Sequence, residues 1–446
     1  MPSRLRTACL APAAVALALA ALPAGAQKAA GGSPALDARI DQESQRVAAQ
    51  LVELRHRIHQ DPELSNRETR TAELVAAHLR SLGLEPRTGV AKTGVTALLK
   101  GGKPGPLIAV RADMDALPVI EQTDLPFKST KKDTFLGQEV GVAHACGHDV
   151  HTTSLLGVAS VLSAIQKDIP GSILFIFQPA EEGPPPGEKG GADLMLEEGV
   201  FASAKPVAVF GLHSFPDLPV GQIGFNPGPT MAAVDQFRIT IRGKQSHGAY
   251  PHQSIDPIVI GSEVVMALQT IRSRNLPPLE PSVITVGIFR GGERFNIIPG
   301  EVMLEGTVRT YKEEVRNEVE RRMRQIVDGI TRANGASFEI DYKRNAPATV
   351  NDPALTSAVQ PLLERVVGAQ NVKIVEPSMG GEDFAYFANQ TPGFFYRLGV
   401  VAPGTTSGGL HTPTFRADDS ALPVGIRVMS RLLVDYLSSY GSQSPR

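Results

Sequence analysis

The sequence predicts an α/β fold: a mostly parallel sheet flanked by helices, interrupted by a smaller inserted α+β domain. A chain of 446 residues exceeds the size at which single cores usually stop growing, so two domains are expected. Three short apolar runs, Leu107–Val110, Ile173–Phe177 and Val207–Leu212, alternate with helical stretches at 152–166 and 190–198. Such alternation is typical of parallel strands with helices on both faces, and ligands of these sheets lie beyond the carboxyl ends of the strands.

Amphipathic helices are expected before and after this series of strands. Apolar residues recur at helical spacing at 41–57 and again at 66–83, where Gly83 is expected to end the second helix. Towards the C-terminus the pattern returns to helix, strand and helix. These later elements are expected at Ala354–Val367, Phe394–Leu398 and Ala421–Tyr440.

The inserted domain is expected at residues 231–343, because strands with antiparallel-looking alternation replace the buried runs near residue 230. Its element order is strand-helix-strand-strand-helix-strand, as in a ferredoxin-like unit. The strands are expected at Phe237–Arg242, Ser282–Phe289, Glu301–Tyr311 and Phe338–Tyr342, and the helices at about 256–272 and 312–333. The surrounding catalytic domain then comprises residues 38–230 and 344–442.

Residues 1–26 have the pattern of a secretory signal peptide. Arg4 and Arg6 give a basic start, Leu10–Leu22 is an apolar run, and Ala24–Ala26 has the small-x-small pattern of a signal-peptidase site. The run is short for a membrane span, and a retained anchor is the alternative. We therefore expect a secreted or periplasmic protein with no membrane attachment after cleavage.

The composition excludes several classes of partner and scaffold. Removing the signal peptide lowers 44 basic residues to 42 against 46 acidic ones, a net charge of −4, so no broad cationic surface for nucleic acid or anionic lipid is expected. Cys9 leaves with that segment, and Cys146 alone cannot form a disulfide within one chain. A single thiol in an oxidising compartment is vulnerable unless something occupies it, and a metal ion would do so.

Charged, imidazole and thiol side chains follow the predicted strands. They are Arg111, Asp113 and Asp115 after the first strand, Cys146, His148 and His151 before a helix, Glu181 and Glu182 after the second strand, His213 after the third, and His411 near the C-terminus. Thiolate, imidazole and carboxylate together suit zinc, manganese, cobalt or nickel. One tetrahedral ion takes four ligands, and these side chains include at least five that can bind a metal. We therefore expect two divalent ions that share a bridge.

The consecutive carboxylates Glu181 and Glu182 are the most informative pair. They follow a buried strand and the segment Gln178–Ala180, where an ordinary surface pair is not expected. One carboxylate can bind metal while its neighbour accepts a proton from the metal-activated water and later donates it to the leaving nitrogen. The pair therefore predicts hydrolysis with metal-activated water as the nucleophile.

An ordered set of motifs resembles the dinuclear metallo-aminoacylases and carboxypeptidases. This family includes hippurate hydrolase, N-acetyl-diaminopimelate deacetylase and plant hydrolases of indole-acetyl-amino-acid conjugates. The resemblance runs from the segment His59–Glu63 to about Leu437. Its motifs are Arg111–Leu117, Ala145–Asp149, Gln178–Gly183, Ser246–Gly248, Phe295–Pro299 and Gly381–Phe384.

The resemblance implies a role for each of these side chains. Cys146 would bridge two metals, Glu181 would be the general base and acid, and His247 would reach the active site of a partner subunit to stabilise the oxyanion. The inserted domain would then mediate a homodimer and close over the site as a lid. The metal ligands would be Cys146, His148, Glu182, His213 and His411; Asn296 and Arg309 would hold the substrate carboxylate, with Gly381 offering backbone donors or making a turn.

Some positions have plainer interpretations. In the wider family a His-x-Asp motif supplies a ligand, but Arg111 replaces that histidine here, as in the subfamily with the Cys-Gly-His motif. We expect Asp113 and His151 to orient ligands rather than bind metal. Glu382 and Asp383 are expected to cap a helix. Ordinary structural roles are expected for His56, His59, His78, His144 and His252.

The expected function is metal-dependent hydrolysis of the amide bond of small N-acyl amino acids or related conjugates. One alternative is a dipeptidase or a peptide-cleaving carboxypeptidase on the same fold, whose dipeptide substrates carry a free ammonium. Another is a secreted binding protein that has lost its chemistry. That alternative predicts a missing ligand or base, and none is missing from the motifs.

Overall fold

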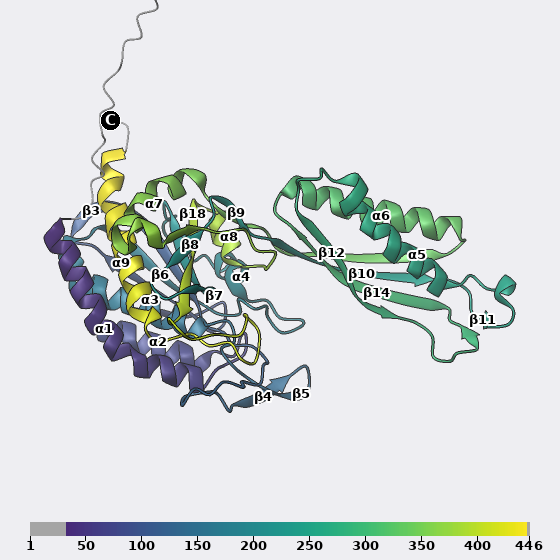
Figure 1. Cartoon of the computed structure of the whole chain (residues 1–446), viewed down its shortest axis with the longest axis horizontal. Coiled ribbons are helices and arrows are strands. Elements are labelled where there is room, and N and C mark those ends of the chain that lie inside the picture. Colours follow the sequence, from purple (N-terminus) through teal and green to yellow (C-terminus); the bar gives the residue numbers. More distant parts are fainter. Residues whose placement is uncertain (1–32, 444–446) are drawn as a thin grey trace, which may run out of the picture.

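The computed structural model describes residues 33–443, so the predicted signal peptide lies outside the described residues. Figure 1 shows two lobes: one contains the N- and C-terminal parts of the chain, and the other contains the central residues. The chain leaves and re-enters the first lobe through two paired strands, β9 (Gly228–Met231) and β16 (Thr349–Asn351). Within residues 33–443, none of the helices combines the length and apolar character that crossing a bilayer requires.

The first lobe is built on an eight-stranded sheet whose central strands are parallel. Its strand order is β1 (Arg87–Val90), β2 (Gly94–Lys100), β6 (Pro170–Gln178), β3 (Lys103–Asp113), β7 (Val209–Pro219), β18 (Gly393–Val401), β8 (Ile223–Phe225) and β17 (Val372–Ile374). The three predicted apolar runs are β3, β6 and β7, which lie side by side. Their carboxyl ends therefore meet at one edge of the sheet, where Glu181 and Glu182 follow β6 as expected. Arg111, Asp113 and His213 were expected after their strands but lie within β3 and β7, because both strands continue past the apolar runs.

Helices cover both faces of this sheet, as predicted. Side chains alternate along β3: Ile108 and Val110 belong to the larger core, whereas Ala109 belongs to the smaller core on the opposite face. The larger core is formed with α1 (Pro34–Gln60), α2 (Thr69–Ser81), α3 (His148–Ala164), α7 (Pro353–Val367) and α9 (Ala421–Gln443), and the smaller one with α4 (Gly191–Glu197) and α8 (Phe384–Ala388). Burial of these apolar surfaces on both faces holds the strand ends rigidly.

The second lobe is the predicted ferredoxin-like insertion. Its four antiparallel strands have the order β12 (Ser282–Arg290), β14 (Glu301–Thr310), β10 (Ala233–Arg242) and β15 (Ser337–Ala346). Helices α5 (Pro257–Thr270) and α6 (Glu313–Ala333) share one core with this sheet. At the end of this lobe that lies far from the first lobe, β11 (Ser246–His247) pairs with β13 (Ile297–Ile298) (Figure 1).

Several boundaries differ from those expected. Helix α1 begins at Pro34, earlier than predicted, and the side chain of Ser33 caps it by accepting a hydrogen bond from Leu36 N. Strand β15 continues to Ala346, past the expected domain boundary at residue 343. The antiparallel edge pair β1–β2 and the hairpin of β4 (Lys132–Phe135) and β5 (Gln138–Gly141) were not predicted. Gly83 follows α2 with φ +79°, in keeping with its predicted role in ending that helix.

Candidate metal centre

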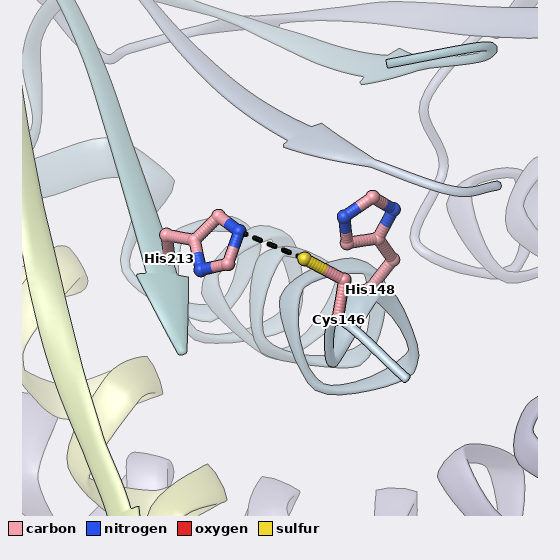
Figure 2. Close-up of side chains that lie close together, drawn as sticks. All are labelled: Cys146, His148 and His213. Carbon is pink, nitrogen blue, oxygen red and sulfur yellow. Dashed lines mark hydrogen bonds between the residues drawn. The ribbon is translucent and has the colours of Figure 1, made fainter. Parts of the chain in front are cut away.

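The predicted ligands converge at the carboxyl edge of the large sheet. Cys146 and His148 stand at the start of α3, His213 lies in β7, and Glu182 follows β6. His411 comes from the loop between β18 and α9. Figure 2 shows Cys146, His148 and His213 side by side, with the sulfur between the two imidazole rings.

The Cys146 sulfur stands at the middle of the group. Its Sγ lies 3.3 Å from His213 Nε2 and 3.2 Å from His411 Nε2. Glu182 Oε1 lies 3.1 Å from His411 Nε2 and 3.8 Å from His148 Nε2. Two sets of three possible ligands, Cys146 with His148 and His213, and Cys146 with Glu182 and His411, share the sulfur. This arrangement suits two cations that share one thiolate.

The local backbone explains how these residues meet. Gly147 adopts φ +84°, and a Cβ there would lie 2.1 Å from Ser214 Oγ, so only glycine fits between Cys146 and His148. His411 also adopts a positive φ, +61°, and its backbone N donates to Ala145 O at 2.8 Å. This bond ties the C-terminal loop to the start of α3 and brings His411 to the cysteine.

The donor atoms fit a divalent metal of intermediate softness. His213 Nδ1 donates to Ser214 O at 2.8 Å, which leaves the Nε2 lone pair directed at the sulfur. His148 Nε2 is buried, and no residue of the described chain forms a hydrogen bond with it. Burial raises the pKa of the Cys146 thiol well above its usual range, and Glu182 and Glu181 raise it further. A bound cation reverses that preference, because thiolate ligation and deprotonation are coupled.

Asp115, a carboxylate for which the sequence predicted no role, connects two of the predicted ligands. Its Oδ1 lies 3.2 Å from His148 Nδ1, and its Oδ2 accepts hydrogen bonds from Glu182 N at 3.0 Å and Ser65 Oγ at 2.7 Å. Asp115 thus orients the His148 ring and fixes the backbone of Glu182. Its position just beyond Asp113, at the end of a strand, was the only signal in the sequence.

Asp113 and His151 form a neighbouring pair. His151 Nδ1 lies 2.6 Å from Asp113 Oδ1, and His151 Nε2 accepts from Ser214 N at 2.7 Å. Both ring nitrogens of His151 are therefore engaged with protein groups, although the pair with His148 also has the spacing of a metal site. These contacts suit the orienting role predicted for both residues, because Ser214 follows the predicted ligand His213.

Glu181 lies beside the predicted ligands but belongs to neither of the two ligand sets that contain Cys146. Its Oε2 is 3.9 Å from His148 Nε2, and its Oε1 accepts from Asp383 N at 3.4 Å. Ala180, directly before it, adopts φ +52° and donates its N–H to Glu68 Oε1 at 2.8 Å, which turns the chain at this point. Burial and the neighbouring acids raise the pKa of the Glu181 carboxyl well above its usual range. The geometry can thus place a proton-exchanging carboxyl next to the metal ligands.

The predicted capping of α8 is only partly correct. Glu382 Oε1 accepts a hydrogen bond from Phe384 N at 2.8 Å, as a capping side chain does. The Asp383 side chain instead accepts from Gln178 Nε2 at 2.6 Å and Ala192 N at 2.8 Å and pairs with Arg111. Asp383 therefore joins α4 and β6 to the turn before α8, because a buried carboxylate gains more from several charged and amide donors than from one cap.

The residues predicted to contact substrate are not gathered around the metal ligands of the same chain. His247 and Asn296 lie together at the far tip of the second lobe, where Gly248 N donates to Asn296 O at 2.8 Å (Figure 1). Arg309 and Gly381 meet at the junction of the lobes, since a Cβ on Gly381 would lie 3.2 Å from Arg309 Nη1. The predicted roles of all four residues stay predictions.

Three of the remaining histidines bond to groups outside the predicted ligand set. His59 Nδ1 lies 3.0 Å from Asp149 Oδ2, which also accepts from Arg55 Nε at 3.0 Å. His56 Nε2 lies 2.9 Å from Asp419 Oδ2, and His78 Nε2 lies 2.8 Å from Ser160 Oγ. His144 is buried beside His59, and His252 lies near the exposed tip.

Comparison with known proteins agrees with this site. A family model described as peptidase family M20/M25/M40 matches residues 109–435. The chain is 40% identical to an N-acetyl-L-cysteine deacetylase of Bacillus subtilis, over 84% of this chain and 85% of that protein. It is 38% identical to thermostable carboxypeptidase 1 of Saccharolobus solfataricus, over 86% of this chain and 95% of that protein.

A solved structure gives the same fold. It is a Bacillus subtilis protein described as a dinuclear metal binding peptidase from the M20 family, with a TM-score of 0.74 and 36% identity over 88% of this chain and 99% of that one. The family resemblance drawn from the motifs is thereby confirmed. The converging ligands, the inserted domain and these likenesses together show that the chain belongs to peptidase family M20/M25/M40.

Proposed function

We propose that this metal-dependent amidohydrolase removes the acyl group from small N-acylated amino acids. The observation that carries the proposal is the Cys146 sulfur, which lies within 3.3 Å of both His213 and His411, while Glu181 belongs to neither ligand set around the sulfur and lies 3.9 Å from His148. The deacetylase relative supports this substrate class, since it is a protein of similar length that acts on an N-acetyl amino acid.

The metal centre would hold two divalent ions per subunit, zinc, manganese, cobalt or nickel. Cys146 would contact both, His148 and His213 would complete one ligand set, and Glu182 and His411 the other. When bound, such a pair of ions lowers the pKa of a water molecule and polarises the substrate carbonyl. The described likeness to a dinuclear metal binding peptidase supports two ions rather than one.

Glu181 would carry the proton through the reaction. Its carboxylate accepts a proton from the attacking water as the new C–O bond forms, and then delivers that proton to the departing nitrogen as the C–N bond breaks. The backbone N–H of Asp383 orients the carboxylate during both transfers. Arg309, which lines a groove of about 360 Å³ on the open face of the inserted sheet, would hold the substrate carboxylate.

We also propose that the protein acts as a homodimer joined through the inserted domain. His247 is exposed at the tip of that domain, far from the ligands of its own chain (Figure 1). The domain carries exposed apolar side chains on and beside its edge strand β12 and helix α5. A second copy of the chain could bury these side chains in a dimer interface. They are Val259, Met266, Leu279 and Phe289.

A substrate panel tests the proposed activity and separates it from peptidase activity. The protein loaded with each of the four metals should hydrolyse N-acetyl and N-benzoyl amino acids with a kcat/KM at least about tenfold above that for unblocked dipeptides, because a free ammonium would approach the cations of the site. Faster cleavage of dipeptides or longer peptides would favour the carboxypeptidase function of the Saccharolobus relative. No turnover of any amide by the metal-loaded protein would contradict both functions.

The location of the protein is a separate proposal. The basic start, the apolar run and the small residues at Ala24–Ala26 support export to the periplasm or the medium. Cell fractionation followed by N-terminal sequencing should find a chain that begins at Gln27 outside the cytoplasm. Recovery of an uncleaved chain from the cytoplasm would contradict it.

A further inference from the structure

Arg111 occupies an unusual position for a guanidinium, fully enclosed at the carboxyl end of β3. Its side chain is inaccessible to solvent, and its donors are used by groups from three separate segments. Nη1 lies 2.6 Å from Asp113 Oδ2, and Nε donates to Gln178 Oε1 at 2.7 Å. Nη2 lies 2.9 Å from both Glu382 Oε1 and Asp383 Oδ1.

The acids around Arg111 adjoin the proposed base. Carboxylate oxygens of Glu181, Glu382 and Asp383 lie within 4.8 Å of one another. Three carboxylates at this spacing repel, and burial makes the repulsion stronger. Arg111 supplies the positive charge that contacts two of the three directly, so the cluster already contains its cation and needs no third metal.

The contacts of Arg111 reach Glu181 by two routes. Gln178, whose amide oxygen Arg111 holds, ends β6 and stands three residues before Glu181 in the chain. Asp383, whose carboxylate Arg111 holds, presents its own backbone N–H to Glu181 Oε1. A hydrogen bond connects the two routes, because Gln178 Nε2 also donates to Asp383 Oδ1 at 2.6 Å.

We propose that Arg111 is a positioning residue for Glu181: by clamping Gln178 and Asp383 together, it fixes the orientation in which the Glu181 carboxylate exchanges protons. The inference rests on the proposed function, in which Glu181 is the base. A guanidinium is required because its planar fork serves acceptors in several directions at once, whereas an ammonium group is a point charge on a flexible stem.

The test is Arg111→Lys in the metal-loaded full-length protein, with Asp383→Ala as a second variant that keeps the backbone N–H but removes the clamped carboxylate. For both we expect two metals per chain by elemental analysis, a KM within about twofold of wild type, and a kcat lowered roughly 10- to 100-fold, because small misplacement of a catalytic group costs about that much. The double variant should lose no more than the worse single one, since both act through one clamp.

Arg431→Lys is the matched control. Arg431 is also a buried arginine with two acidic partners, Asp37 at 2.7 Å and Asp41 at 3.3 Å, but it joins α9 to α1. It should lower the free energy of unfolding and leave kcat unchanged, which separates positioning from general destabilisation.

The outcomes distinguish this inference from the proposed function beneath it. If Glu181→Gln is inactive while Arg111→Lys and Asp383→Ala keep the wild-type kcat, the positioning role is wrong and the function stands. If the Arg111 variant loses metal in proportion to activity, Arg111 acts on the metal centre instead, which also overturns the inference. If Glu181→Gln is fully active, the proposed base is wrong and the inference falls with it. Should Arg111→Lys fail to fold, Asp383→Ala decides alone.

Discussion

The two lobes hold their predicted functional residues in opposite ways. In the first lobe the ligands are mostly buried, and Asp115, His151 and Ser214 fix the side chains or backbone of their neighbours. At the tip of the second lobe, His247 is exposed and the adjacent Phe295 is 97% exposed. The comparison teaches that the chain preorganises the residues proposed for metal binding and proton transfer, whereas the residue proposed for oxyanion binding has no comparable support within its own chain.

The largest effect should come from the first lobe, at Glu181. Glu181→Gln keeps the shape of the side chain and removes its ability to take a proton. We expect kcat to fall roughly 10²- to 10⁴-fold, the usual range for loss of a general base, with two metals still bound. Steady-state kinetics and elemental analysis of the same preparation measure both quantities. Full activity in the variant would show that another group accepts the proton.

The next effect tests whether the second lobe acts on a partner. His247→Ala should lower kcat roughly 10²- to 10³-fold, as expected for the loss of one oxyanion donor. Mixing equal amounts of inactive His247→Ala and inactive Glu181→Gln chains under conditions of subunit exchange should restore roughly a quarter of the wild-type activity, because half of the dimers are mixed and each has one intact site. Light scattering should show dimers throughout. No recovery despite exchange, or a fully active monomer, would sink the shared-site proposal.

A smaller effect should appear at Asp115, which supports two ligands at once. Asp115→Asn keeps the size of the side chain but weakens the partner of His148 Nδ1. We expect metal affinity to fall roughly 10- to 100-fold, the usual effect of removing a carboxylate behind a metal-binding histidine. Competition with a chelating indicator measures it. The same substitution at the partly exposed Asp168, which pairs with Arg39 just past the opposite end of α3 from His148, is the control and should leave affinity unchanged.

The sequence predicted the elements of both lobes where the apolar pattern was strong. Strands β3, β6 and β7 were found because their runs are buried and bounded by turn residues, and the ferredoxin-like order followed from alternation. The edge strand β1 was missed because Arg87, Thr88 and Gly89 are exposed and carry no such pattern. Local signals suffice only where one face of an element is buried.

The residues of the candidate site were predictable from the sequence, but the hydrogen bonds and ion pairs between them were not. The motifs placed Cys146, His148, Glu182, His213 and His411 together, and the structure brings them to one place. No spacing could show that Asp115, rather than Asp113, stands closest to His148, since this depends on how the chain bends after β3. The link between Arg111 and Asp383 spans 272 residues, so only the folded chain reveals it.

The smallest expected effect concerns the free energy of unfolding. Its dependence on pH should differ between the two lobes. Below the metal centre, Asp149 accepts from Arg55 and His59, and Glu121 lies 3.2 Å from the other nitrogen of His59. Burial alone would lower the pKa of His59, but Asp149 and Glu121 raise it to about 9. In the second lobe the corresponding buried pair, Arg316 with Asp235, does not contain a histidine.

A raised histidine pKa means that protonation favours the folded state. The stabilisation is therefore fully present below the unfolded-state pKa of about 6.5 and is lost as the pH rises through about 9. We expect the free energy of unfolding of the first lobe to fall by on the order of 3 kcal/mol across that window. Urea titrations at several pH values should show this slope in the wild type and a much flatter one in His59→Gln. His78→Gln is the matched control, because burial lowers the pKa of His78 and places its titration below the window. An unchanged slope in His59→Gln would mean that the charge on His59 does not stabilise the helix that carries His148.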